Sequence, residues 1–180
     1  MEKVFEQQLD QDTGKSLSLY FYTNVSNMPE FRKKVLSGEL KCCILKVSLI
    51  IDVFQVVVAA NKAVKREKLG ILVTKSVFTE MIYLMSLSDS ISASLNRFGA
   101  QDDDENVVIV VIHEKENKEY PEEIVSHING QLTSFLDIRK CCNEKLIKEI
   151  YKIGRNELET SSLVDAVISR IGGSYPIKMR

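Results

Sequence analysis

Residues 52–70 read DVFQVVVAANKAVKREKLG, the clearest helical pattern in the chain. The apolar side chains recur at the spacing of one helix face: Val53, Val56, Val57, Ala60 and Val64. Polar or basic side chains fall on the opposite face: Gln55, Lys62, Lys65 and Arg66. The pattern predicts an amphipathic helix over residues 52–66 that buries the valine stripe, with Gly70 as its exit.

Two alanines of the same stretch lie between these faces. Ala59 and Ala63 are four residues apart, so they stack on one side of the predicted helix. Small side chains there allow another backbone to come close. That backbone belongs either to a partner protein or to a neighbouring helix of the same chain, and the sequence leaves both interpretations open.

The composition is that of an ordinary globular protein. Of the 180 residues, 44% are hydrophobic and 27% are charged, and we expect one domain over residues 1–180. The net charge of −1 provides no overall attraction to nucleic acid or to an acidic membrane, so such a contact needs a local patch. The first residues lack a signal-peptide pattern, and no apolar stretch approaches the roughly 18 residues of a spanning helix. We therefore expect a soluble intracellular protein.

Strand patterns occur on both sides of a group of helices. Residues 16–22 alternate between apolar and polar side chains, and with residues 3–9 they predict a hairpin. Residues 107–112 are β-branched throughout, which is typical of a strand buried on both faces. Two other segments are ambiguous: residues 42–51, either extended or helical, and a weak strand within residues 130–138.

Helical patterns fill most of the remaining chain. Besides residues 52–66, they cover residues 27–38, a segment from about Ser76, residues 88–99, a short stretch at 122–128, residues 143–154 and residues 162–173. Ser162 with Asp165 forms a shortened capping signal for the last helix. These elements predict an α+β single domain with a small, mostly antiparallel sheet and about six helices around it.

The sequence contains no convincing catalytic or metal site. Gly14-Lys15-Ser16 resembles the end of a phosphate-binding loop, but the first glycine of that motif is missing and a strand follows instead of a helix. His113 and His127 have no nucleophile signature near them. The lone carboxylate of Glu80 has no evident partner for acid–base chemistry.

Two further features suggest metal binding without the right spacing. The acidic run 102–105 lacks the alternating ligands and central glycine of a calcium loop. The cysteines form vicinal pairs, Cys42-Cys43 and Cys141-Cys142, without the intervening residues that zinc sites need. We therefore expect neither a metal nor a cofactor, and we interpret the cysteines as reduced thiols.

Basic residues concentrate in and just after the helix at 52–66. They are Lys62, Lys65, Arg66, Lys68 and Lys75, with Arg97 farther along the chain. Such a run is either a solvated helix face or a surface that binds the phosphates of a nucleic acid.

Several of these segments together resemble one family. The matching residues are Asp52-x-Phe54-Gln55, Ala59-Ala60-Asn61-Lys62-Ala63-Val64, Lys68-x-Gly70, Thr79-Glu80, Ile91-Ser92, Phe98-Gly99 and Ile150-Tyr151-Lys152. The chain is similar over nearly its whole length to the TPRKB family, the small kinase-binding subunit of the KEOPS complex, which is also called EKC.

The resemblance implies a regulatory subunit that performs no chemistry. KEOPS forms threonylcarbamoyladenosine next to the anticodon of tRNA, and a separate subunit, the threonylcarbamoyltransferase OSGEP, carries out the transfer. A member of the family binds the atypical kinase PRPK directly, promotes its ATPase activity and helps to hold tRNA. It reaches OSGEP only through the kinase, and the expected location is the cytoplasm and the nucleus.

Side chains outside the core stripes suggest which residues meet each of these partners: small or apolar ones for the kinase and basic ones for tRNA. We expect kinase contacts at the alanine flank and the outer edge of the last helix: Ala59, Ala63, Asp165, Ala166, Ser169 and Arg170. We expect tRNA contacts at the basic residues Lys62, Lys65, Arg66 and Lys75. The basic tail that follows Gly173 departs from the family pattern.

Two other functions remain compatible with the residues. The first is a small hydrolase or transferase that uses His113 or a cysteine. The second is an interaction module unrelated to RNA, for which the basic face is only a solvated surface.

Overall fold

Two strands predicted from their side-chain patterns form the centre of the sheet. The computed structural model describes residues 3–174, and within them β2 (Lys15–Thr23) pairs with β4 (Val107–Glu114). The sheet is antiparallel with the order β1-β2-β4-β3, where β1 is Val4–Gln8 and β3 is Cys43–Lys46. A fifth strand, β5 (Gln131–Thr133), also pairs with β2, beyond the end of β1.

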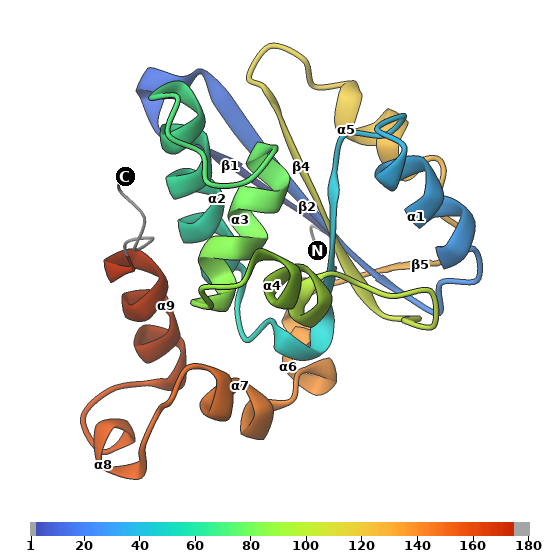
Figure 1. Ribbon diagram of the computed structural model, residues 1–180. Helices are drawn as coiled ribbons and strands as arrows, with labels where there is room; N and C mark the ends of the chain where they lie inside the picture. Colours follow the sequence, from blue (N-terminus) through green and yellow to red (C-terminus); the bar gives the residue numbers. More distant parts are fainter. Residues whose placement is uncertain (1–2, 175–180) are drawn as a thin grey trace.

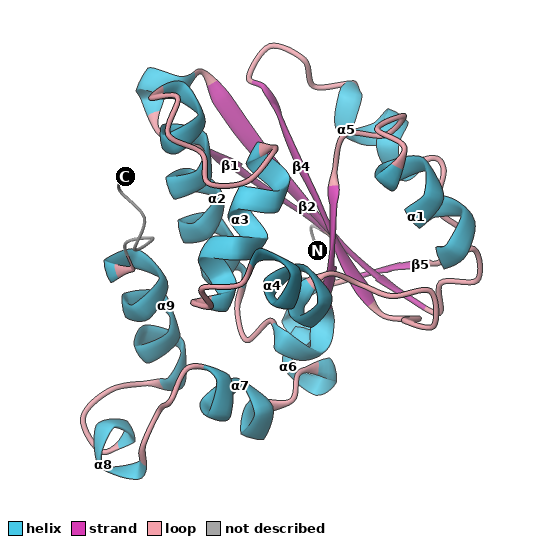
Figure 2. Cartoon of the chain, in the orientation of Figure 1, coloured by secondary structure: helices cyan, strands magenta, loops and turns pink. Residues whose placement is uncertain are grey.

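Helices cover both faces of this sheet (Figures 1 and 2). On one face lie α2 (Val53–Lys68), α3 (Val77–Ser86) and α4 (Ile91–Phe98), and on the other lie α1 (Met28–Leu36) and α5 (Tyr120–Val125). Alternate residues of β4 enter the two cores: Val108 and Val110 face α2 and α3, while Ile109 and Val111 face α1. This explains why the strand is apolar throughout, as its sequence predicts.

The N-terminal hairpin is confirmed. A short 3₁₀ turn, η1 (Gln11–Thr13), connects β1 to β2, and Gly14 follows it with a left-handed φ of 67°. Lys15 lies in β2 and pairs with Glu114 on β4 at 2.5 Å. The sequence Gly14-Lys15-Ser16 is therefore a hairpin turn followed by a strand, not a phosphate-binding loop.

Each of the two ambiguous segments combines a short strand with one or more helical turns. After β3, residues 42–51 continue as a 3₁₀ turn, η2 (Val47–Leu49). The weak strand expected within 130–138 is confined to β5, and the chain then turns through η3 (Phe135–Asp137) into α6 (Ile138–Cys141). The described residues hold nine α-helices because short turns such as α6 add to the longer helices predicted from periodicity.

Three helices close the described chain. They are α7 (Glu144–Ile150), α8 (Arg155–Leu158) and α9 (Leu163–Gly173). The capping signal predicted for α9 is confirmed, because the Ser162 hydroxyl accepts a hydrogen bond from the Asp165 amide at 3.0 Å. Residues 175–180 of the basic tail lie outside the described residues. Within residues 3–174, no helix is both long enough and apolar enough to cross a membrane.

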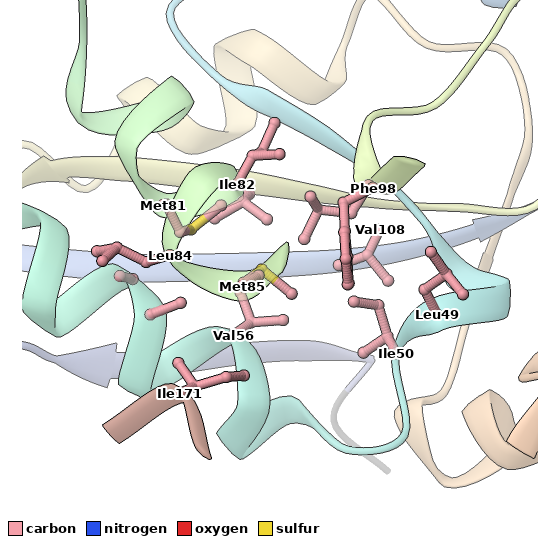
Figure 3. Close-up of a cluster of buried hydrophobic side chains, with 14 of the residues drawn as sticks. Leu49, Ile50, Val56, Met81, Ile82, Leu84, Met85, Phe98, Val108 and Ile171 are labelled. Carbon is pink, nitrogen blue, oxygen red and sulfur yellow. The ribbon is translucent and has the colours of Figure 1, made fainter. Parts of the chain in front are cut away.

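Helix α2 is buried more deeply than its valine stripe predicts. Ala59, Ala60 and Ala63 are all 0% exposed, and α2 packs against both α3 and α9. Figure 3 shows Val56 of α2 between Met85 of α3 and Ile171 of α9. The alanines thus mediate internal helix packing, which was one of the two interpretations left open by the sequence.

Gln55 is also buried, although the helical pattern places it on the polar face. Its side-chain oxygen accepts from the Ile51 amide at 3.0 Å, and its nitrogen donates to the Leu49 carbonyl at 3.0 Å and to the Tyr151 hydroxyl at 3.1 Å. The Tyr151 hydroxyl donates in turn to the Met85 carbonyl at 2.7 Å. This network joins η2, α2, α3 and the end of α7, and its hydrogen bonds offset the cost of burying polar atoms.

The close packing of α2 makes a testable prediction. Ala63→Leu should lower the free energy of unfolding by about 1–3 kcal/mol, because added methylenes in a filled core force neighbouring side chains apart. Thermal unfolding followed by circular dichroism should show a midpoint several degrees below wild type. Ala93→Leu, at an exposed alanine of α4, is the control and should leave the midpoint nearly unchanged. Equal midpoints for the two variants would contradict the packing.

Candidate protein- and RNA-binding surfaces

Helices α2 and α9 pack side by side, and each has residues exposed to solvent. Phe54 of α2 is 54% exposed, and Val58, one turn farther along, is partly exposed. A Cβ atom built on Gly172 of α9 would lie 3.9 Å from the Val58 side chain, so the two helices approach closely here. Asp165 and Ser169 are exposed along α9. An apolar edge with polar neighbours is typical of a protein-binding surface.

Three of the residues expected to contact a kinase are not accessible on this surface. Ala59 and Ala63 are 0% exposed and Ala166 is 2% exposed, since all three belong to the core in which α2 and α9 participate. The expected alanine contact flank is therefore corrected. A long charged residue such as arginine at position 63 would enter the core rather than probe a partner.

Arg170, another expected kinase contact, is held by its own chain. Its guanidinium forms a bidentate ion pair with Glu157 at 2.6 and 2.7 Å and donates to the carbonyls of Ala166 and Lys152. The hydrogen bonds from Arg170 lower the pKa of the Glu157 carboxyl. Arg170 thus connects α9 to α8 and to the turn after α7, and only part of its side chain remains exposed.

Lys62, the first of the basic residues expected to meet tRNA, points toward α9. Its ammonium group donates to the carbonyl oxygens of Ile171 at 2.8 Å and Gly172 at 3.0 Å, and to the carbonyl oxygen of Ser174. The Ser174 hydroxyl lies 3.2 Å away. Burial lowers the pKa of Lys62, and the nearby Arg66 guanidinium adds to this effect.

Arg66 is the partner of Glu80, the carboxylate that appeared unpaired in the sequence. Glu80 is 0% exposed and lies 2.7 Å from the Arg66 Nε atom. The same carboxylate accepts from the amides of Val73 and Thr74 at 3.0 and 2.8 Å, while Arg66 also donates to the Ile71 carbonyl at 2.8 Å. The pair therefore organises the loop between α2 and α3.

Between residues 62 and 75, the basic residues that face solvent are Lys65, Lys68 and Lys75. Lys65 pairs with Asp10 at 2.9 Å, and Lys68 donates to the Asp12 carbonyl, so both lie beside the N-terminal hairpin turn. Lys75 is exposed in the loop that the Arg66–Glu80 pair organises. Of the four residues expected to bind tRNA, Lys65 and Lys75 are therefore the two whose ammonium groups are accessible.

The geometry around His113 argues against a hydrolase at this position. His113 Nε2 lies 3.0 Å from Ser18 Oγ, and Nδ1 lies 2.9 Å from the Glu114 carbonyl. Because a carbonyl only accepts, Nδ1 carries the proton and Nε2 accepts from the serine. Ser18 is 0% exposed within the sheet, so its hydroxyl is inaccessible to a substrate.

The Cys42–Cys43 pair does not form a reactive centre either. Cys42 and Cys43 are buried, and burial raises the pKa of Cys42 to about 12 and that of Cys43 well above its usual value. Such thiols remain protonated and unreactive. Among the residues that the structure describes, no group of three or more His, Cys, Asp or Glu side chains is arranged to hold a metal ion.

A largely apolar cleft of about 530 Å³ opens between α1, β3, α3 and α4. Its apolar lining residues come from three helices: Val35 and Leu36 of α1, Phe78 and Ile82 of α3, and Leu95 of α4. Ser76 and Thr79 at its margin bond to each other in the capping box of α3. The sequence motifs did not predict this cleft, because its walls come from segments far apart in the chain.

Comparison with known proteins now assigns the family. The model of the family described as "Kinase binding protein CGI-121" matches residues 22–173, which include all of α2 and α9. This chain belongs to the CGI-121 family. The zebrafish (Danio rerio) EKC/KEOPS complex subunit TPRKB is 35% identical over 150 residues, which cover 83% of this chain and 86% of the zebrafish protein.

Fungal proteins extend this relationship within the CGI-121 family. The EKC/KEOPS complex subunit CGI121 of Yarrowia lipolytica is 27% identical over 167 residues, covering 87% of this chain and 92% of its own. The CGI121 subunit of Kluyveromyces lactis is 27% identical over 134 residues, or 74% and 83% of the two chains. The similarity to the TPRKB family noted in the sequence is thereby confirmed.

The Arg66–Glu80 pair generates a prediction about stability. Arg66→Met should lower the free energy of unfolding by about 3–5 kcal/mol, because it leaves a buried carboxylate without its counter-ion. Urea unfolding at neutral pH measures this difference. Lys65→Met, which removes a solvent-exposed charge one position away, should remain close to wild type. If the two variants were equally stable, Arg66 would have no structural role.

Proposed function

We propose that this CGI-121 family member is a non-catalytic subunit of a KEOPS complex that binds a PRPK-type kinase directly. Its relatives are named EKC/KEOPS complex subunits, and the family name specifies kinase binding. The observation that carries the proposal is the accessible edge of α2 and α9, which lies entirely within the matched residues. The buried Ser18–His113 pair supports the absence of catalysis by this chain.

The kinase-binding edge that we propose differs from the one expected from the sequence. It consists of the exposed residues Phe54, Val58, Asp165 and Ser169, with the buried alanines only supporting the spacing of the two helices. An exposed aromatic side chain is a common anchor in protein interfaces. Binding at a rigid helix pair would stimulate the kinase ATPase by favouring one conformation of the kinase, since a ligand shifts an equilibrium through its differential affinity.

We also propose that the subunit helps to bind tRNA for threonylcarbamoyladenosine formation. Lys65 is exposed in the last turns of α2 and Lys75 is exposed in the loop after it, and Lys68 lies between them in the sequence. Phosphates attract such a group even when the net charge of the protein is near zero. OSGEP would be reached through the kinase, and the complex would act in the cytoplasm and the nucleus.

The kinase-binding edge can be tested by replacing its exposed aromatic side chain with a charged one. Phe54→Asp should weaken binding to purified PRPK by tenfold or more, because truncation of an aromatic anchor commonly costs about 2 kcal/mol or more. Interferometry measures the affinity, and circular dichroism checks the fold. Leu36→Asp, at a leucine that is 77% exposed on α1, is the matched control and should bind normally. Unchanged binding by Phe54→Asp would place the kinase elsewhere.

The RNA contact can be tested through its salt dependence. Lys75→Glu and Lys65→Glu should each reduce the slope of log affinity for tRNA against log salt by about one unit, the effect of one lost phosphate contact. Filter binding over a range of salt concentrations provides the slope. Lys118→Glu, in the exposed loop after β4, serves as the control. Slopes that do not change in any variant would remove these lysines from the RNA surface.

A further inference from the structure

We propose that Lys62 is a positioning residue that fastens the end of α9 to α2, and that it serves kinase binding rather than RNA binding. The part that concerns the kinase rests on the function proposed above. The fastening itself follows from the geometry of this chain and can be measured without any partner. In place of the phosphate contact expected from its position in a basic run, Lys62 has a structural role within the chain.

The end of α9 presents carbonyl groups that need donors. The last carbonyls of any helix have no partner within the helix, and they carry partial negative charge. In α9, the carbonyls of Ile171 and Gly172 accept from the Lys62 ammonium at 2.8 and 3.0 Å, and the carbonyl of Ser174 accepts from it as well. The Ile171 carbonyl also accepts from the Ser174 hydroxyl at 2.8 Å, so Lys62 and Ser174 together satisfy the end of α9.

The usual way of ending a helix is absent here. Many helices end in a left-handed glycine, whose backbone turns so that nearby amides cap the carbonyls. Gly172 and Gly173 lie within α9, and Ser174 follows with an extended backbone at φ −69° and ψ 133°. Two glycines in the last turn also weaken the helix intrinsically. The ammonium of Lys62 compensates for both features.

The donors of Lys62 are fully occupied by this arrangement. An ammonium group has three N–H donors, and four oxygen atoms of α9 and Ser174 lie within hydrogen-bond distance. The side chain is partly buried between the two helices. A phosphate would have to displace these carbonyls to reach it, whereas the exposed ammonium of Lys65 is accessible directly.

The position of the contact connects it to the proposed kinase edge. Lys62 lies one helical turn after Val58, and Gly172 packs against Val58. Ser169 and Asp165 lie on the same helix as Gly172, toward its N-terminus. Loss of the contact would loosen α9 and therefore change the spacing between its exposed residues and Phe54.

Hydrogen exchange of the free, full-length protein tests the fastening. In Lys62→Met, the amides of residues 166–174 should exchange roughly tenfold faster, the ratio expected for loss of a cation at a partly buried helix end. Amides of β2 and β4, which report global unfolding, should exchange at the wild-type rate. Lys65→Met is the matched control and should show no change in α9. Lys62→Gln, which retains a neutral donor, should give an intermediate rate and replaces Lys62→Met if that variant does not fold.

Measurements of kinase and tRNA binding by the same variants test whether Lys62 serves kinase binding rather than RNA binding. Lys62→Met should weaken PRPK binding by roughly tenfold, in step with the exchange of α9, and leave the salt slope of tRNA binding unchanged. Wild-type exchange rates in α9 would overturn the fastening. A salt slope reduced by about one unit would make Lys62 a phosphate contact instead. Normal kinase affinity with a loosened α9 would overturn the link to the kinase, while failure of the wild-type protein to bind PRPK would overturn the proposed function and leave the fastening intact.

Discussion

The arrangement of the helices depends on how closely α3 and α9 approach α2. Helix α2 packs against both of them and against strand β2, and its fully buried alanines leave room for this close packing. Bulkier side chains would push α9 away from α2, and the exposed edge that the two helices share would be lost. The same residues that build the core therefore set the geometry of the proposed kinase-binding surface.

Charged side chains of α2 contribute to structure as much as to surface charge. Arg66 neutralises the buried carboxylate of Glu80, and Lys62 satisfies the end of α9. A buried charge must be paired or fully hydrogen-bonded, so the charged groups of these two residues are used for contacts within the chain. The exposed lysines of the same basic run, Lys65, Lys68 and Lys75, lie at the C-terminal end of α2 and in the loop after it. The basic run of this chain thus has fewer accessible positive charges than its sequence indicates.

The two surfaces proposed on α2 lie toward opposite ends of the helix. Phe54 and Lys65 are eleven residues apart, which corresponds to about 17 Å along an α-helix. A kinase at the first end and RNA at the second would not compete for the same atoms. Because α2 is held on several sides, it would present both surfaces in a fixed relation, and the subunit would act by positioning its partners rather than by changing a bond itself.

Local patterns in the sequence determined the hairpin, the central strand β4, the helices α2 and α9 and the serine cap of α9, because periodicity and capping depend only on neighbouring residues. The family was also recognisable from the residues of α2. Only the tertiary structure decided that Gln55 is buried, that Ala59 and Ala63 face other helices of the same chain, and that Lys62 and Arg66 point inward. The physical reason is that helical periodicity shows which residues share a face, whereas their environment depends on distant segments, here α3, α7 and α9, that pack against that face.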